Sequence, residues 1–121
     1  MKILDTNILI YASQAVFSYL QPLVTDPANA VSIVVKIETL SFPNLLLGDR
    51  AYLESIFLVL QTIQLSDEIA EKAIEIRQLK KISLGDAIVA ATALTQNCPL
   101  ITRNTSGFRH IQNLILENPL L

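Results

Sequence analysis

The sequence predicts an α/β fold: a three-layer α/β/α domain in which helices cover both faces of a central parallel sheet. Short apolar runs that suit buried strands alternate with segments whose apolar residues recur at helical spacing. This alternation is typical of parallel strands joined by crossover helices. The chain has 121 residues and lacks internal repeats, low-complexity tracts and a linker, so we expect a single domain over residues 1–121.

Two strands and several helices are expected in the first half of the chain. Lys2 to Leu4 is a short apolar run, and the Asp-Thr-Asn that follows it predicts a strand entering a helix capped by Asp5 or Thr6. Val31 to Val35 is apolar and β-branched apart from one serine, as buried parallel strands are. The predicted helices run from Ile8 to Tyr11, from Ala15 to Leu20, from Ile37 to Phe42 and from Gly48 to Leu60.

The second half of the chain repeats this alternation. Ser66-Asp67 is expected to cap a helix on whose exposed side Glu68 and Lys72 form an i,i+4 pair. The helix predicted from Ser83 to Asn97 is apolar on nearly every side, so we expect it to lie inside the core. The other predicted elements are a strand from Ile63 to Leu65, a strand from Pro99 to Thr102, a polar loop from Arg103 to Phe108 and a short apolar tail from His110 to Leu121.

The apolar content is high for a small monomer, since 51% of the residues are hydrophobic and the mean hydropathy is +0.45. No apolar run is long enough for a membrane span, and the longest are Ile56 to Leu60 and Ala87 to Ala91. We therefore expect a protein partner rather than a membrane to cover part of the surface. A homodimer is expected, with the helices from Ile8 to Leu20 and from Ala51 to Leu60 as candidate contacts.

Single cysteine and histidine residues exclude several classes of protein. Cys98 has no partner for an intrachain disulfide, and Cys98 with His110 cannot form a zinc finger. With no apolar leader at Met1, an intracellular, cytoplasmic location is expected. The net charge of −2 excludes a general basic surface, so any action on RNA would use a local site.

Three carboxylates occupy positions where parallel sheets bind ligands. Asp5 follows the first strand, Glu38 comes shortly after the second, and Asp86 lies in the first turn of the core helix. Clustered carboxylates suit Mg²⁺ or Mn²⁺, which can activate water for phosphodiester cleavage. Each also has a structural interpretation: Asp5 as a helix cap, Glu38 as a solvated residue, and Asp86 as part of a capping box with Ser83. The pattern alone leaves both interpretations open.

Four segments resemble the PIN-domain family, and in particular its VapC-type toxin ribonucleases. They are MKILDTNILIY from Met1, SIVVKIETL from Ser32, SLGDAIVAATAL from Ser83 and LITRNTSGF from Leu100, and together they span almost the whole chain in the order of the family. The resemblance implies a PIN-like fold and a metal-dependent endoribonuclease, with Asp5, Glu38 and Asp86 as the catalytic, metal-binding acids and Mg²⁺ or Mn²⁺ as cofactor. It also implies a cognate antitoxin.

The last of these segments departs from the family pattern. Active members usually carry an acidic residue in this loop, where the present chain has Asn104 and Gly107. We therefore expect a weak or empty second metal position, with Thr6, Thr102 and Asn104 supporting the site through hydrogen bonds. The departure keeps an alternative open, in which a degenerate PIN domain binds RNA or protein without cutting it.

Basic residues gather in two places near the predicted site. Arg103 and Arg109 flank the last loop, while Lys81 precedes the Asp86 helix with Arg77 and Lys80. We expect Arg103, Arg109 and Lys81 to bind RNA phosphates, although a solvated helix end would also explain the second group.

Two further expectations concern alternatives and partners. A receiver-like or flavodoxin-like module shares the predicted alternation, but the sequence lacks a suitable phosphorylatable aspartate after its third predicted strand. The antitoxin is expected to place an amphipathic helix in an apolar groove and to send an arginine or lysine into the carboxylates.

Overall fold

The computed structural model describes all 121 residues and contains one five-stranded sheet. All neighbouring strands are parallel, and their order is β3-β2-β1-β4-β5. The strands are β1 (Ile3–Leu4), β2 (Ala30–Ser32), β3 (Gln61–Ile63), β4 (Leu100–Ile101) and β5 (Leu116–Glu117). The predicted parallel sheet is confirmed.

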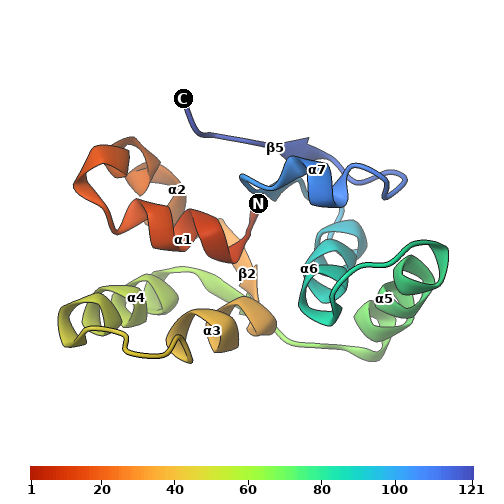
Figure 1. Ribbon diagram of the computed structural model, residues 1–121, viewed down its shortest axis with the longest axis horizontal. Coiled ribbons are helices and arrows are strands. Elements are labelled where there is room, and N and C mark those ends of the chain that lie inside the picture. Colours follow the sequence, from red (N-terminus) through yellow and green to blue (C-terminus); the bar gives the residue numbers. More distant parts are fainter.

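Helices cover both faces of this sheet. Figure 1 shows α1 to α4 on one side of β2, and α5 and α6 on the other side. The predicted three-layer α/β/α architecture is therefore confirmed. The helices are α1 (Thr6–Ala12), the 3₁₀ helix η1 (Ala15–Leu20), α2 (Gln21–Val24), α3 (Ile33–Leu40), α4 (Leu47–Val59), α5 (Asp67–Leu79), α6 (Leu84–Thr95) and α7 (Thr105–Phe108).

The second strand ends earlier than the sequence predicts. Ser32 adopts an extended conformation and its hydroxyl accepts a hydrogen bond from the Val34 amide at 3.2 Å, so it caps α3. The predicted strand from Val31 to Val35 is wrong beyond Ser32, and the helix begins at Ile33 rather than at Ile37. A capping hydroxyl and burial of the new helix outweigh the strand preference of the β-branched residues.

Three smaller predictions also need correction. The third strand lies at Gln61–Ile63 instead of Ile63 to Leu65. The predicted polar loop from Arg103 to Phe108 contains the short helix α7, because its four residues are capped by the Asn104 side chain. Lys72 pairs with Glu75 at 3.1 Å rather than with Glu68.

The core is one cluster of 27 buried apolar residues. The predicted central helix is confirmed, since every residue of α6 from Ala87 to Ala93 is buried. Four alanines in that stretch let α6 pack closely against the sheet and α5. No helix has the length and apolar character needed to cross a membrane.

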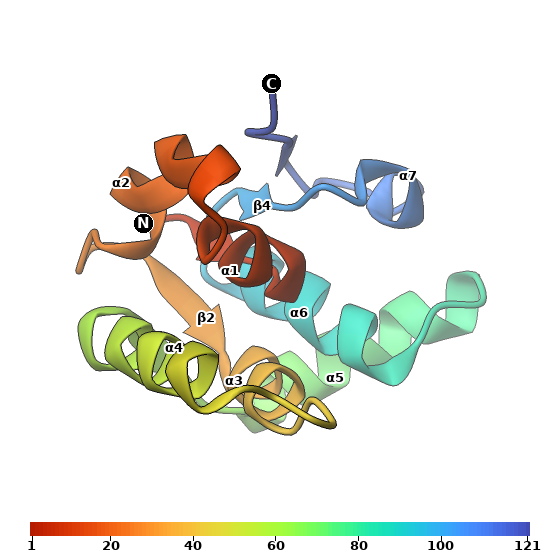
Figure 2. The ribbon, with the colours of Figure 1, turned by 60° about the vertical axis from the view of Figure 1, so that its left-hand side comes forward.

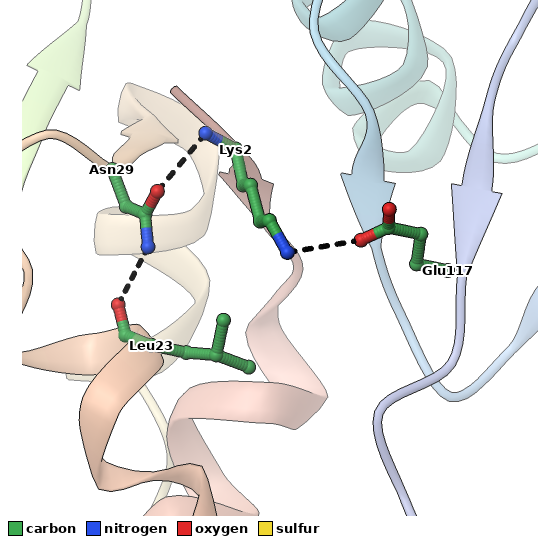
Figure 3. Close-up of polar contacts among 4 residues, drawn as sticks. All are labelled: Lys2, Leu23, Asn29 and Glu117. Carbon is green, nitrogen blue, oxygen red and sulfur yellow. Dashed lines mark hydrogen bonds and ion pairs between the residues drawn. The ribbon is translucent and has the colours of Figure 1, made fainter.

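Asn29 ties together the amino-terminal end of the sheet, as Figure 3 shows. Its side chain is 5% exposed, accepts a hydrogen bond from the Lys2 amide at 3.0 Å and donates one to the Leu23 carbonyl at 3.0 Å. The Lys2 ammonium forms an ion pair with Glu117 of β5 at 3.3 Å. These contacts fix the start of β1, at the end of the strand opposite to Asp5.

Candidate functional site

Asp5, Glu38 and Asp86 line the same open hollow, which has a volume of about 350 Å³. Asp5 comes from the carboxyl end of β1, Glu38 from α3 and Asp86 from the first turn of α6. These helices meet because α3 contacts both α1 and α6, an arrangement visible in Figure 2. We call this space the acidic hollow; its lining is Asp5, Thr6, Asn7, Ile10, Tyr11, Glu38, Phe42, Asp86 and Asn104.

Asp5 is buried, and both of its carboxylate oxygens are held in place. Oδ1 accepts the Thr6 amide at 2.9 Å, while Oδ2 accepts the Thr102 hydroxyl at 2.8 Å and the Asn7 amide group at 3.4 Å. Asp5 is also the N-cap of α1, so its capping role and its place in the hollow coexist. The result is a carboxylate of fixed orientation at the carboxyl end of β1.

Glu38 lies against the first turn of α6, where its carboxylate faces Gly85. A β-carbon on Gly85 would lie 3.4 Å from Glu38 Oε1 and 3.5 Å from Oε2. These are distances of ordinary van der Waals contact, so the Glu38 carboxylate rests against the first turn of α6 and an alanine at position 85 would fit beside it.

Asp86 has its side chain free. Ser83 caps α6 by accepting the Asp86 backbone amide at 3.2 Å, and the Asp86 carboxylate itself makes no hydrogen bond within the chain. The capping-box interpretation therefore applies to Ser83 and to the Asp86 backbone alone. The Asp86 side chain remains available to the acidic hollow.

Burial and the neighbouring acids raise the pKa values of Asp5 and Glu38. Burial raises the pKa of Asp5 above its ordinary value, and the nearby charge of Asp86 adds to this, while hydrogen bonds from Thr102 and Thr6 partly oppose it. The pKa of Glu38, whose side chain is partly exposed, is also raised, first by partial desolvation and then by repulsion from Asp5 and Asp86, while a hydrogen bond from Thr6 partly opposes the rise. All ion pairs of the chain lie elsewhere, at Lys2–Glu117, Arg50–Glu54 and Lys72–Glu75. The negative charge of the hollow is thus uncompensated.

The donor groups fit a hydrated divalent cation. No three carboxylate, thiolate or imidazole groups converge closely enough to bind one ion directly. Mg²⁺ retains several waters and uses only one or two protein carboxylates, so direct contact with all three acids is unnecessary. Thr6 Oγ1 also lines the hollow, and its hydroxyl lies close enough to Glu38 to lower the pKa of that carboxyl.

The loop after β4 supplies an amide where the family pattern has an acid. Asn104 Oδ1 caps α7 by accepting the Gly107 amide at 3.3 Å, and it also accepts the Ser106 hydroxyl at 3.4 Å. A β-carbon on Gly107 would lie 2.5 Å from Asn104 Nδ2. The missing side chain of Gly107 therefore gives Asn104 room to turn toward α7.

Sequence reasoning missed four residues that line the hollow: Asn7, Ile10, Tyr11 and Phe42. Asn7 donates to Asp5 and to Thr102 at 3.4 Å and accepts the Arg103 amide at 3.2 Å, so it links α1 to the loop after β4. Asn7 and Tyr11 share one face of α1 because they are four residues apart. The positions of Asn7 and Tyr11 on the helix that follows Asp5 are the sequence signal that would have identified these two residues.

The predicted RNA-binding cations lie in different places. Arg103 does not line the acidic hollow itself, but its guanidinium donates to the hydroxyl of Tyr11, which does, and this contact places Arg103 at the rim. Lys81 lines a separate hollow of about 430 Å³ with Arg77, at the end of α5. Arg109 follows α7 and lines neither hollow. Of the three, only Arg103 forms hydrogen bonds with residues that line the acidic hollow, namely Asn7 and Tyr11.

The chain is thus an α/β/α domain whose parallel sheet carries acidic residues at its carboxyl edge. The sequence pattern of the PIN domain matches residues 2–114, and the protein belongs to the PIN-domain family. The resemblance predicted from the sequence is thereby confirmed. Domains of this family are generally nucleases.

Several solved structures share the fold over almost the whole chain. A toxin–antitoxin complex from Klebsiella pneumoniae is 30% identical with a TM-score of 0.82, covering 99% of this chain and 98% of that one. VapBC2 from Rickettsia felis, bound to a DNA fragment from its promoter, is 27% identical with a TM-score of 0.79 and 97% coverage of both chains. FitAcB from Neisseria gonorrhoeae is 24% identical with a TM-score of 0.78 and 98% coverage of both. Comparison with curated proteins gave no match.

Proposed function

We propose that this PIN-domain protein is a Mg²⁺- or Mn²⁺-dependent endoribonuclease and the toxin of a type II toxin–antitoxin pair. The observation that carries the proposal is the acidic hollow, where Asp5, Glu38 and Asp86 meet without a cationic side chain to neutralise them. The similarity to toxin–antitoxin complexes supports the same assignment.

The roles of the residues follow from their contacts. A bound divalent ion would supply an activated water and stabilise the departing oxygen. Asp5 is the main candidate ligand, since the hydroxyl of Thr102 and the amide of Thr6 fix its orientation. Glu38 and Asp86 would hold the water molecules around the ion. These assignments make the three acids the catalytic residues of the proposed enzyme.

The surroundings of the acids suit single-stranded or looped RNA. The acidic hollow is open, and Phe42 on its lining is 62% exposed. An unpaired base can stack on such a ring, whereas a base inside a duplex cannot reach it. Arg103 at the rim is placed to bind an adjacent phosphate, while Lys81 and Arg109 would contact RNA farther from the acids.

A neighbouring groove suits the proposed antitoxin. This apolar hollow has a volume of about 260 Å³ and is lined by Ile10, Ser13, Phe42, Pro43, Asn44, Leu45, Leu46, Asp49 and Leu53. Leu46 is 71% exposed and Leu47 beside it is 83% exposed, so apolar surface is available to a partner. An amphipathic helix lying here could extend a basic side chain into the adjacent acids.

A homodimer remains part of the proposal. Val16 of η1 is 75% exposed and Leu58 of α4 is 89% exposed, and both belong to the helices predicted as dimer contacts. Light scattering of the purified chain is expected to give twice the monomer mass at tens of micromolar, and Leu58→Glu is expected to lower it. A single monomeric species at that concentration would contradict the dimer.

The alternative is a PIN domain that binds RNA without cutting it. It is motivated by Asn104 and Gly107, which leave the last loop without an acidic side chain. A catalytically inactive protein would retain RNA binding but show no metal-dependent products.

Cleavage of a labelled single-stranded RNA distinguishes the two functions. The purified chain is expected to cut with Mg²⁺ or Mn²⁺ and to stop cutting in excess chelator. Asp86→Asn is expected to lower the rate by about 100-fold or more, because a charged group of the metal site is lost. Asp67→Asn, at the exposed start of α5, is the matched control and should keep the rate of the unmodified protein. Equal cleavage by Asp86→Asn would overturn the nuclease assignment.

A further inference from the structure

We propose that Tyr11 is a positioning residue that holds Arg103 at the rim of the acidic hollow, away from the carboxylates and ready to bind an RNA phosphate. This inference rests on the proposed nuclease function and adds a residue to it. Tyr11 and Arg103 are 92 positions apart in the sequence, yet the Arg103 guanidinium donates a hydrogen bond to the Tyr11 hydroxyl. The guanidinium carbon also lies 5.3 Å from the centre of the Tyr11 ring.

Further contacts hold both Tyr11 and Arg103 in place. The Arg103 backbone amide donates to Asn7 Oδ1 at 3.2 Å, which fixes the start of the arginine side chain against α1. The Tyr11 ring packs edge-on against Phe17 of η1, with 4.8 Å between ring centres and 69° between ring planes. Tyr11 therefore offers a braced ring and a fixed hydroxyl to a long side chain that would otherwise move freely.

The position of Arg103 needs such a constraint because of the charges nearby. Arg103 belongs to the loop that also gives Asn104 to the acidic hollow, yet it forms no ion pair with Asp5, Glu38 or Asp86. A mobile guanidinium beside uncompensated carboxylates is attracted to them. If it folded onto the acids, it would occupy the place of the metal ion. Tyr11 prevents this by supplying an alternative partner.

Tyr11 is also a partner that RNA can replace. Its hydroxyl and ring are uncharged, so they hold the guanidinium more weakly than a phosphate would. A phosphate offers two charged oxygens in the geometry of the guanidinium fork. Together with the bond from the Arg103 backbone to Asn7, the contact with Tyr11 favours the rim position of Arg103 in the absence of RNA and can be given up when a phosphate binds.

A metal-binding experiment without RNA tests the inference independently of cleavage. Calorimetric titration with Mn²⁺ is compared for the unmodified chain, Tyr11→Leu, Arg103→Ala and the double variant. Tyr11→Leu is expected to weaken Mn²⁺ binding by about 10-fold, because the freed Arg103 competes for the carboxylates. In the double variant, binding should return to the unmodified value. Weak binding that persists in the double variant, or unchanged binding in Tyr11→Leu, would overturn the inference.

Kinetics on single-stranded RNA give the second readout. Tyr11→Leu and Arg103→Ala are each expected to raise KM by about 10-fold. Each should also reduce the slope of log KM against log salt concentration by about one, the amount expected for the loss of one phosphate contact. Tyr11→Phe keeps the ring but loses the hydroxyl, so its KM should lie between that of the unmodified chain and that of Tyr11→Leu. Tyr19→Phe is the control, because the Tyr19 hydroxyl accepts the Leu121 amide and does not touch Arg103.

The outcomes separate this inference from the proposed function. No cleavage by the unmodified chain, together with the expected Mn²⁺ pattern, would refute the nuclease function and leave the Tyr11–Arg103 relation standing. Normal cleavage with effects of Tyr11→Leu that are undiminished in the Arg103→Ala background would refute the positioning role and leave the nuclease function standing. A fall in Tm alone, with unchanged Mn²⁺ binding and KM, would show that Tyr11 is purely structural.

Discussion

Thr102 Oγ1 and Asp5 Oδ2 are joined by a buried hydrogen bond of 2.8 Å that links the carboxyl ends of β4 and β1. The same hydroxyl oxygen accepts the Asn104 amide at 3.0 Å. Thr102→Val keeps the shape of the side chain but removes one of the hydrogen-bond donors to the Asp5 carboxylate. We expect the free energy of unfolding to fall by about 1–3 kcal/mol, measured by urea titration. Thr102→Ser keeps the hydroxyl and should lose less stability than Thr102→Val; the reverse order would contradict this role.

Asp5→Asn is predicted to stabilise the metal-free protein while abolishing activity. The pKa of Asp5 is raised by burial above its ordinary value of 3.8, so the folded state binds this proton more tightly than the unfolded chain. The stability that the group contributes is complete below pH 3.8 and is lost as the pH rises through the raised value. At pH 7 in chelator, Asp5→Asn should therefore have a higher Tm than the unmodified chain.

The pH dependence provides the control for that prediction. The Tm difference between Asp5→Asn and the unmodified chain should shrink as the pH falls toward 4, where the native carboxyl becomes protonated as well. Adding Mg²⁺ at pH 7 should raise the Tm of the unmodified chain and leave Asp5→Asn nearly unchanged. A lower Tm for Asp5→Asn in chelator at neutral pH would contradict the electrostatic argument.

Asn104→Asp and Gly107→Asp are predicted to have opposite effects, although both restore an acid to the last loop. Aspartate at 104 can still cap α7 and adds a charge to the lining of the acidic hollow, so Mn²⁺ affinity should rise by several-fold. Aspartate at 107 would bring its β-carbon within 2.5 Å of Asn104 Nδ2 and displace that cap, which lowers Tm. Titration calorimetry and thermal unfolding measure the two effects, and equal behaviour of the variants would contradict them.

Asn29→Ala is predicted to destabilise the fold without changing the rate of RNA cleavage. It leaves the Lys2 amide and the Leu23 carbonyl without their side-chain partner, which should cost about 1–3 kcal/mol in denaturant unfolding. Lys2→Met is the matched control, since it removes only the partly exposed ion pair with Glu117 and should cost about 1 kcal/mol or less. The RNA cleavage rate of folded Asn29→Ala should equal that of the unmodified chain, and a selective loss of rate would contradict a purely structural role.

Periodicity and strand ends predicted much of this molecule. They predicted the parallel sheet and the central position of α6, because these depend on local sequence and on a general rule of sheet topology. Strand ends also placed the three acids at one edge of the sheet, but only the resemblance to the PIN-domain family singled them out as functional residues. The end of β2 was mistaken because a single capping hydroxyl at Ser32 converts a strand-like run into a helix. The contact between Tyr11 and Arg103 had no local signal, since it depends on how α1 and the loop after β4 come together in space.

Ile10 and Phe42 line both the acidic hollow and the apolar hollow beside it. The two spaces therefore share a wall, and a substitution in that wall alters both at once. If the proposed antitoxin binds the apolar hollow, a substitution of Ile10 or Phe42 that changes its fit would also change how the proposed nuclease receives RNA. Variants that escape inhibition at these two positions would carry a defect in their own activity, which makes such escape self-limiting.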